Sequence, residues 1–184
     1  MSELATYEFG QGAPSGRRPL RIALLGYRSN PFSGGQGVYL KFVSRALVDA
    51  GHQVDVISGE PYPELDERVG LIKLPGLNLF GVPNHVTALR PRHLLSATDF
   101  FEWFSMLSGG FPEPFTFGRR LTRYFSGISD PYDIVHDNQS LCYGLLKVAR
   151  RTSVICTIHH PIVGHRVRVI SEGVFLPVGG VPGT

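Results

Sequence analysis

Blocks of apolar residues alternate with polar, glycine-rich and proline-rich segments along the chain. Residues 20–27, LRIALLGY, form a nearly continuous apolar run, which is typical of a strand buried on both faces of a parallel sheet. From residue 36 to residue 50 the apolar positions recur at helical spacing, and Gly51 ends that helix. Residues 53–58, QVDVIS, predict a second strand. A strand, a helix and a strand in this order indicate a right-handed βαβ unit.

The same alternation continues through the rest of the chain. The pattern predicts strands over residues 69–74, 132–137 and 153–160, helices over residues 96–107, 114–128 and 140–151, and a loop over residues 75–91. It therefore predicts an α/β fold with a doubly wound, mostly parallel, Rossmann-like sheet. We expect a flexible leader over residues 1–19, one Rossmann-like domain over residues 20–162, and an atypical Val-, Gly- and Pro-rich tail over residues 163–184.

Composition and charge narrow the function classes. A hydrophobic content of 42% with 18% charged residues is that of a globular domain, and no apolar run is long enough for a membrane span. The leader lacks the apolar core of a secretion signal, so we expect a cytoplasmic protein, free or at the inner face of the membrane. The net charge of +3 gives weak support to an anionic ligand or a membrane surface, and no nucleic-acid-binding motif is present. Cys142 and Cys156 are expected to be free thiols.

The glycine-rich entrance to the first helix is a candidate site. The stretch Gly34-Gly35-Gln36-Gly37 stands between a buried strand and an amphipathic helix. The first N–H groups of a helix lack internal partners and carry the positive end of its dipole, so this segment is placed to bind a phosphate. Plain turn chemistry explains the glycines equally well. Neither G-x-G-x-x-G at the strand end nor G-x-x-x-x-G-K-[ST] is present, which argues against a dinucleotide-dependent oxidoreductase and excludes a P-loop nucleotidase.

Polar residues and histidines follow the last two predicted strands. His159 and His160 are neighbours at a strand end, so only one of them can face the crevice of the sheet. A lone histidine there more often has a structural role. Metal ligation is less expected still, because no carboxylate or cysteine accompanies the histidines at a recognised spacing. Asp137 and Asn138 are suited to cap the helix predicted from residue 140.

Three stretches together resemble a known family. RIALLGYRSNPFSGGQGVYLKFVSRALVDAGHQVDVISGEPYP, YDIVHDNQSLCYGLL and CTIHHPI resemble the N-terminal half of a GT-B glycosyltransferase of family 4, over residues 21–162. The resemblance implies two Rossmann-like domains across a cleft, the N-terminal one holding mainly the acceptor and the C-terminal one most of a nucleotide-sugar donor. It also implies transfer with retention of configuration to a sugar or lipid-linked acceptor, with no metal or other cofactor and no nucleic-acid partner.

The same resemblance implies roles for individual residues. The residues against the donor pyrophosphate would be Gly34, Gly35 and Gln36. The catalytic residue near the reacting sugar would be His159, which we expect to face the crevice in place of His160. The residues that line the acceptor side of the cleft would be Asp137, Asn138 and His160.

An aromatic segment has two interpretations. Phe100, Phe101, Trp103, Phe104 and Met106 could contact a lipid-linked acceptor, with the protein touching the membrane at its periphery. The favoured interpretation is a helix packed against the sheet, because bulky apolar residues usually lie in cores.

The resemblance ends near residue 162. The following residues, VGHRVRVISEGVFLPVGGVPGT, lack the helical pattern of the family, and nothing matches the paired glutamates and the phosphate-binding Arg and Lys of its C-terminal domain. Truncation or a shifted reading frame would give such a tail. We therefore expect this chain alone to transfer no sugar, because a GT-B site needs two closing domains. The alternatives are a non-catalytic module that binds a carbohydrate or an anion and, less favoured, a Rossmann oxidoreductase.

Overall fold

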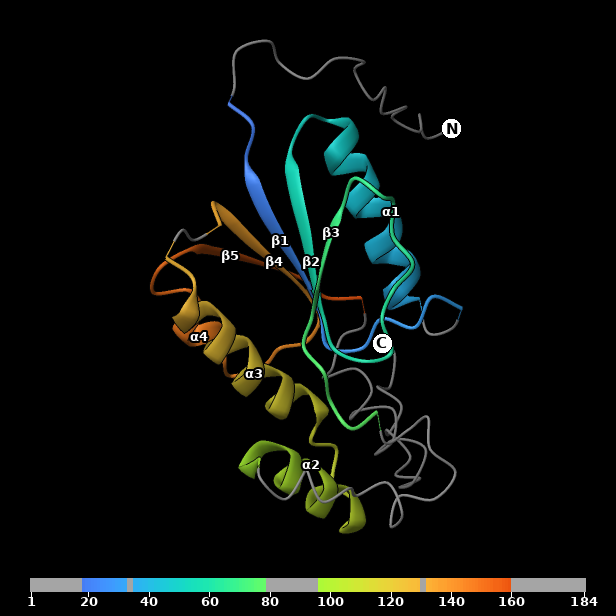
Figure 1. Cartoon of the computed structure of the whole chain (residues 1–184), viewed down its shortest axis with the longest axis vertical. Helices are drawn as coiled ribbons and strands as arrows, with labels where there is room; N and C mark the ends of the chain where they lie inside the picture. Colours follow the sequence, from blue (N-terminus) through green and yellow to red (C-terminus); the bar gives the residue numbers. More distant parts are fainter. Residues whose placement is uncertain (1–17, 33–34, 79–95, 130–131, 160–184) are drawn as a thin grey trace, which may run out of the picture.

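A parallel sheet forms the centre of the structure, a computed structural model that describes residues 18–32, 35–78, 96–129 and 132–159. Within these residues five strands pair in the order β3-β2-β1-β4-β5 (Figure 1). The strands are β1 (Arg21–Gly26), β2 (Gln53–Ser58), β3 (Gly70–Lys73), β4 (Ile134–Asn138) and β5 (Ser153–Thr157). The predicted doubly wound, Rossmann-like α/β fold is confirmed, and the strand order reverses between β1 and β4.

Helices cover both faces of the sheet. The helices are α1 (Gln36–Asp49), α2 (Ala97–Leu107), α3 (Glu113–Gly127) and α4 (Leu145–Val148). α1 packs on one face, and α3 and α4 pack on the other. α2 extends beyond the sheet and contacts α3 (Figure 1). Within the described residues, no helix has both the length and the apolar character needed to cross a bilayer.

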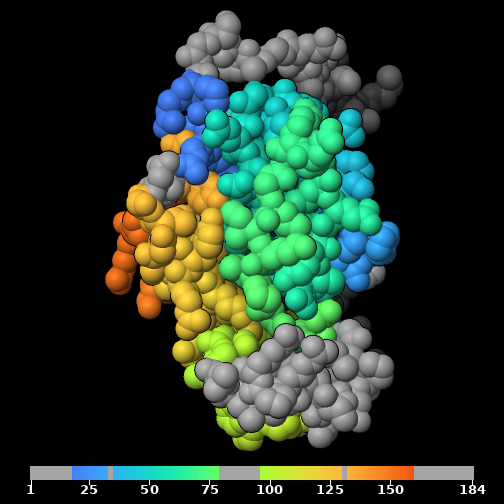
Figure 2. Space-filling model, viewed as in Figure 1, coloured from blue at the N-terminus to red at the C-terminus, as the bar shows by residue number. Residues whose placement is uncertain are grey.

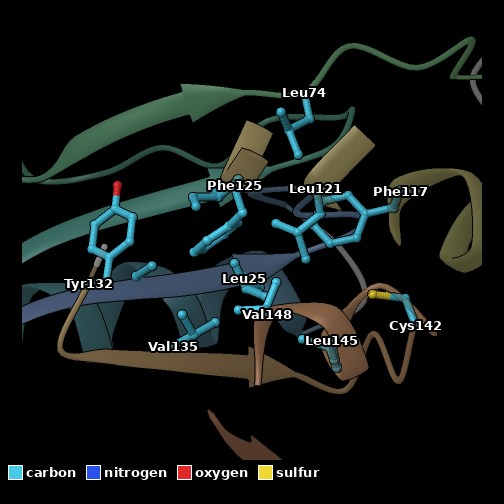
Figure 3. Close-up of a cluster of buried hydrophobic side chains, with 12 residues drawn as sticks. Leu25, Leu74, Phe117, Leu121, Phe125, Tyr132, Val135, Cys142, Leu145 and Val148 are labelled. Carbon is cyan, nitrogen blue, oxygen red and sulfur yellow. The ribbon is translucent and has the colours of Figure 1, made fainter. Parts of the chain in front are cut away.

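Side-chain alternation along the strands divides the interior into two apolar layers. In β1, Ile22 and Leu24 pack with Leu40 of α1, whereas Ala23 and Leu25 point to the opposite face. Burial on both faces explains the continuous apolar run of residues 20–27. The larger layer, shown in Figure 3, includes Leu25, Leu74, Phe117, Leu121, Phe125, Tyr132, Val135, Cys142, Leu145 and Val148.

The helix predicted over residues 140–151 is wrong in length, because only Leu145–Val148 is α-helical. A tight turn precedes it. The buried Asp137 carboxylate accepts hydrogen bonds from the Ser140 hydroxyl and from the Leu141 backbone N–H, the latter at 3.0 Å. Leu141 has a positive φ of 47°, which a right-handed helix cannot include. Side-chain hydrogen bonds of this kind compete with helical ones, so the apolar spacing overestimated the helix.

The other predicted elements are confirmed, with small differences at their ends. Cys142 and Cys156 are both free thiols, as predicted. Residues 1–17 of the predicted leader, residues 79–91 of the predicted loop and the whole predicted tail lie outside the described residues.

Candidate functional site

The candidate site lies at the carboxyl ends of β1 and β4, where the strand order reverses. From β1 the chain passes through a loop to α1 and on to β2, whereas β4 leads through α4 to β5 on the other side. Connections that diverge in this way leave a crevice, and ligands of doubly wound folds bind there. We refer to this place as the switch point.

The start of α1 presents its backbone N–H groups at the switch point. Gly35 is the N-cap, with a φ of 73°, a conformation that glycine adopts without strain. Within the described residues no side chain caps the helix, and its first turn has no acidic residue. Apart from its chain neighbours, no described residue has an atom within 4 Å of the place where a Gly35 Cβ would stand. Among the described residues, no side chain therefore caps the positive end of the helix dipole. Gly34 lies outside the described residues.

Gly37 has a different role from Gly35. A Cβ at residue 37 would stand 2.5 Å from the carbonyl oxygen of Ser29 and closer still to that of Asn30. The two backbones therefore touch, and only glycine leaves room for this contact. Ser29 is fully buried and accepts a hydrogen bond of 2.9 Å from the Ser58 hydroxyl. The start of α1 is thereby held against the residues that follow β1 and β2.

Hydrogen bonds join His159, after β5, to the end of β4 and to the start of α1. His159 Nε2 lies 2.5 Å from Asn138 Oδ1, and Asn138 Nδ2 donates to the Gln36 carbonyl oxygen at 3.3 Å. Because the amide nitrogen is the donor, Oδ1 accepts, and His159 Nε2 carries the proton. The His159 backbone N–H donates to Gln139 Oε1 at 3.0 Å, and the residue is exposed. The structure thus brings together three predicted site residues: Gln36, Asn138 and His159.

A second set of side chains, which the sequence analysis did not assign to the site, lies beside His159. The Tyr39 ring meets the His159 ring edge-on, with centroids 4.8 Å apart. The Thr157 hydroxyl lies 3.2 Å from the Tyr39 hydroxyl and 2.7 Å from His136 Nε2. Two signals could have found this set. His136 stands two residues before Asn138 and shares its side of β4, and Tyr39 lies about one turn along α1.

His136 is the titratable member of this second set. Burial lowers its pKa below the usual value of 6.5, the Asp137 charge opposes the change, and His159 adds to it. A histidine with a lowered pKa is uncharged at neutral pH. The imidazole can then exchange a hydrogen bond with Thr157 without placing a charge beside His159.

Asp137 does not take part in this hydrogen-bonded group. The Asp137 side chain is fully buried, and its carboxylate holds the turn through Ser140 and Leu141. Its side chain is therefore occupied inside the domain. His160 lies outside the described residues. Among the residues that the structure describes, no group of three or more His, Cys, Asp or Glu side chains is placed to hold a metal ion.

One oxygen of a buried carboxyl group at the start of α3 has no hydrogen-bond partner among the described residues. No described residue forms a hydrogen bond with Glu113 Oε2, and Arg28 Nη1 lies 4.0 Å away. Glu113 lines a cavity of about 20 Å³ together with Tyr27, which follows β1. Burial raises the pKa of Glu113 to about 7, the Arg28 charge opposes the change, and Glu102 adds to it.

Glu113→Gln is expected to stabilise the domain at pH 8, and its benefit should shrink as the pH falls toward 4. The pKa is higher in the folded chain than its ordinary value of 4.5, so unfolding releases a proton between these two values. Wild-type stability therefore falls as the pH rises through this window. We expect a gain of about 1–2 kcal/mol at pH 8, measured by urea unfolding across the pH range. The exposed Glu64→Gln is the control, and a pH-independent difference for Glu113→Gln would contradict the assignment.

A family model and a curated relative both match the chain to glycosyltransferases. The sequence profile of Glycosyltransferase Family 4 matches residues 33–174. An MMP alpha-(1->4)-mannosyltransferase from Mycolicibacterium hassiacum is 46% identical over 149 residues, which make up 80% of this chain and 36% of that relative. The chain thus spans little more than a third of the relative's length. Among solved structures, the crystal structure of LpCGTa in complex with UDP matches with a TM-score of 0.42 and 18% identity, over 76% of this chain and 30% of that chain.

Proposed function

The chain belongs to glycosyltransferase family 4, and from this premise we propose that it forms the acceptor-binding side of a site that transfers a sugar from a nucleotide-sugar to an acceptor. The observation that carries the proposal is the hydrogen-bonded path from His159 through Asn138 to Gln36 at the start of α1. This path supports the proposal because it holds an exposed imidazole beside the N-terminal end of α1, which is suited to bind a diphosphate.

The start of α1 is the proposed place of the donor diphosphate. Gly35 leaves the helix end open, and Gly37 lets the loop after β1 hold that end in place. Negative charge grows on the diphosphate as its bond to the sugar breaks. N–H dipoles that are already fixed stabilise this charge without rearranging, which lowers the barrier.

His159 is the proposed contact to the reacting sugar. His159 Nε2–H donates its hydrogen bond to Asn138 Oδ1. In the neutral ring Nδ1 is therefore an acceptor, which can take a hydrogen bond from a sugar hydroxyl. The Tyr39 ring and the Gln139 side chain restrict the position of His159. A group held in this way orients the sugar over the diphosphate, and orientation of this kind accelerates transfer.

We further propose that a mannosyl group is transferred and that the configuration at its anomeric carbon is retained. The support for mannose is the 46% identical relative, which is described as an MMP alpha-(1->4)-mannosyltransferase. The acceptor would then be a sugar with a free hydroxyl group.

His159→Ala is expected to lower the transfer rate by about 100-fold or more, because an oriented contact to the reacting sugar is lost. The measurement is made in a full-length family 4 relative, with the substitution at the histidine that matches His159, as the initial rate with radiolabelled GDP- and UDP-sugars and a panel of sugar acceptors. The control is His52→Ala, since His52 accepts a hydrogen bond from the Leu20 N–H at the other end of the sheet. We expect the control to keep its rate within about twofold. Equal rates for wild type and His159→Ala would leave His159 with a structural role only.

A thermal-shift assay separates the transferase from the rival functions. Nucleotide-sugars at about ten times their Kd should raise the free energy of unfolding by about 1.4 kcal/mol and the Tm by about 3–6 °C. NAD and NADP should leave the Tm unchanged. A shift with NAD(P) alone would favour an oxidoreductase. A nucleotide-sugar shift is expected of both the transferase and a non-catalytic binding module, and turnover by a full-length relative separates these two.

A further inference from the structure

Helix α2 turns its polar side inward and its aromatic side outward. Its two buried residues are Thr98 and Glu102, which stand one turn apart. Glu102 is buried because it forms an ion pair of 2.5 Å with Arg120 of α3. Arg120 also pairs with Asp99 at 2.6 Å. These ion pairs orient the helix, so the favoured interpretation of a packed aromatic segment is wrong for Phe100, Phe101 and Phe104, which are exposed. Trp103 and Met106 of the same segment are half-buried.

The outward side of α2 is a continuous aromatic stripe, which we define as Phe100, Phe101, Phe104 and Leu107. These four side chains are between 42% and 59% exposed, a large exposure for apolar residues that stand next to one another. Their positions, i, i+1, i+4 and i+7, lie on one face of a helix. The Phe101 ring contacts the Phe115 ring of α3 with centroids 5.2 Å apart, so the stripe continues onto α3.

Phe115 also lines a groove between α3 and α4 that contains basic residues. The groove measures about 440 Å³, and its charged residues are Arg119, Arg123 and Lys147. No carboxylate lines it. Figure 2 shows that α3, in yellow, reaches the surface directly above α2, in yellow-green. We name Phe115, Arg119, Arg123 and Lys147 the basic groove.

The three cationic side chains of the basic groove have no carboxylate partner among the described residues, whereas comparable cations on the opposite face of the sheet do. No ion pair joins Arg119, Arg123 or Lys147 to a carboxylate of the described residues. On the α1 side, each of three comparable cations has a carboxylate partner within 4.0 Å: Lys41, Arg45 and Arg68. The unneutralised charge therefore lies beside the exposed aromatic stripe.

We propose that the aromatic stripe and the basic groove together dock this protein on an anionic lipid bilayer. Aromatic side chains gain free energy at the boundary between headgroups and acyl chains, where α2 would lie parallel to the membrane plane. Arginine and lysine next to them meet the phosphate groups of anionic lipids. The charge complementarity favours lipid over a second copy of this chain, because two copies would bring like charges together. The proposal does not depend on sugar transfer.

Vesicle binding by the 184-residue chain tests the proposal. We expect co-sedimentation with vesicles of phosphatidylcholine mixed with phosphatidylglycerol, and little with phosphatidylcholine alone. Binding should weaken as salt is added, because salt screens the charges. The single tryptophan of the chain, Trp103, stands in α2 and reports insertion directly. Its emission should move to shorter wavelength with the anionic vesicles.

Two variants and one control locate the docking surface. Arg119→Ala/Arg123→Ala/Lys147→Ala should weaken vesicle binding by about 100-fold, and Phe100→Ser/Phe104→Ser by about tenfold. All of these side chains are exposed, so the variants should fold as wild type does. The control Lys41→Ala/Arg45→Ala/Arg68→Ala removes the same charge from the opposite face and should bind within about threefold of wild type.

Several outcomes would overturn the proposal. Equal binding to neutral and anionic vesicles, no binding, or equal losses in the control and the basic-groove variant would each show that this surface does not recognise anionic lipid. A dimer in light scattering that Phe100→Ser/Phe104→Ser dissociates, without a change in vesicle binding, would assign the stripe to a second copy. None of these outcomes would change the result expected for His159→Ala in the transfer assay.

Discussion

Gly37→Ala should destabilise the domain by about 3 kcal/mol and lower its Tm by about 6–12 °C. The added methyl group would stand 2.5 Å from the Ser29 carbonyl oxygen and closer to that of Asn30. Both are backbone atoms, and Ser29 is fully buried, so neither can turn away as a flexible side chain would. The start of α1 must therefore move, and with it the Gln36 carbonyl that Asn138 contacts. The loss is measured by urea unfolding and by differential scanning calorimetry.

Gly127→Ala is the matched control for this change. Gly127 is the last residue of α3, and no atom lies within 4 Å of its missing Cβ. The same substitution there should change stability by less than about 0.5 kcal/mol. If Gly37→Ala were as stable as Gly127→Ala, the close contact between the loop after β1 and α1 would not hold in solution.

Arg120→Met is expected to destabilise the domain by about 3–5 kcal/mol, because it leaves a buried carboxylate without its partner. The Glu102 side chain is 3% exposed and lies 2.5 Å from Arg120. Methionine has a similar length, so the change removes the charge and leaves most of the packing. Within the described part of the chain, Glu102 would keep the hydrogen bond of 3.2 Å that it accepts from the Leu77 N–H. Urea unfolding measures the loss.

A second substitution tests the cause of this loss. Arg120→Met/Glu102→Gln should recover more than half of the lost stability, because the glutamine is neutral and still accepts from Leu77. Arg150→Met, at an exposed arginine without an ion pair in the described residues, should change stability by less than about 0.5 kcal/mol. If the double variant were no better than the single one, lost packing and not an unpaired charge would be the cause.

The strands and α1 could be predicted from the sequence because each depends on a pattern of neighbouring residues. The apolar run of residues 20–27 requires burial on both faces, and this property alone indicates a parallel sheet with helices on each side. Gly51 marks the end of α1 within two residues. The order of elements then leads to the doubly wound topology through the handedness of βαβ units.

The sequence predicted where the candidate site lies, but not which of its side chains contact one another. Parallel strands end at one edge of the sheet, so residues after β1, β4 and β5 were expected near one another. Which of them touch depends on the strand register, which places Asn138 opposite Thr157. Asp137 shows the difference: in the sequence it is equivalent to Asn138 and both side chains are buried, but Asp137 bonds within the turn after β4, whereas Asn138 bonds His159.

The sequence by itself determined the parallel sheet and which residues follow the carboxyl ends of its strands, because hydrophobic periodicity and turn residues act over a few neighbours. Only the tertiary structure decided which side of α2 faces outward. The apolar pattern of α2 favoured buried phenylalanines, but Arg120, 18 residues after Glu102, draws that carboxylate inward. A buried charge is costly without its partner, so one ion pair between two helices outweighs a local apolar pattern.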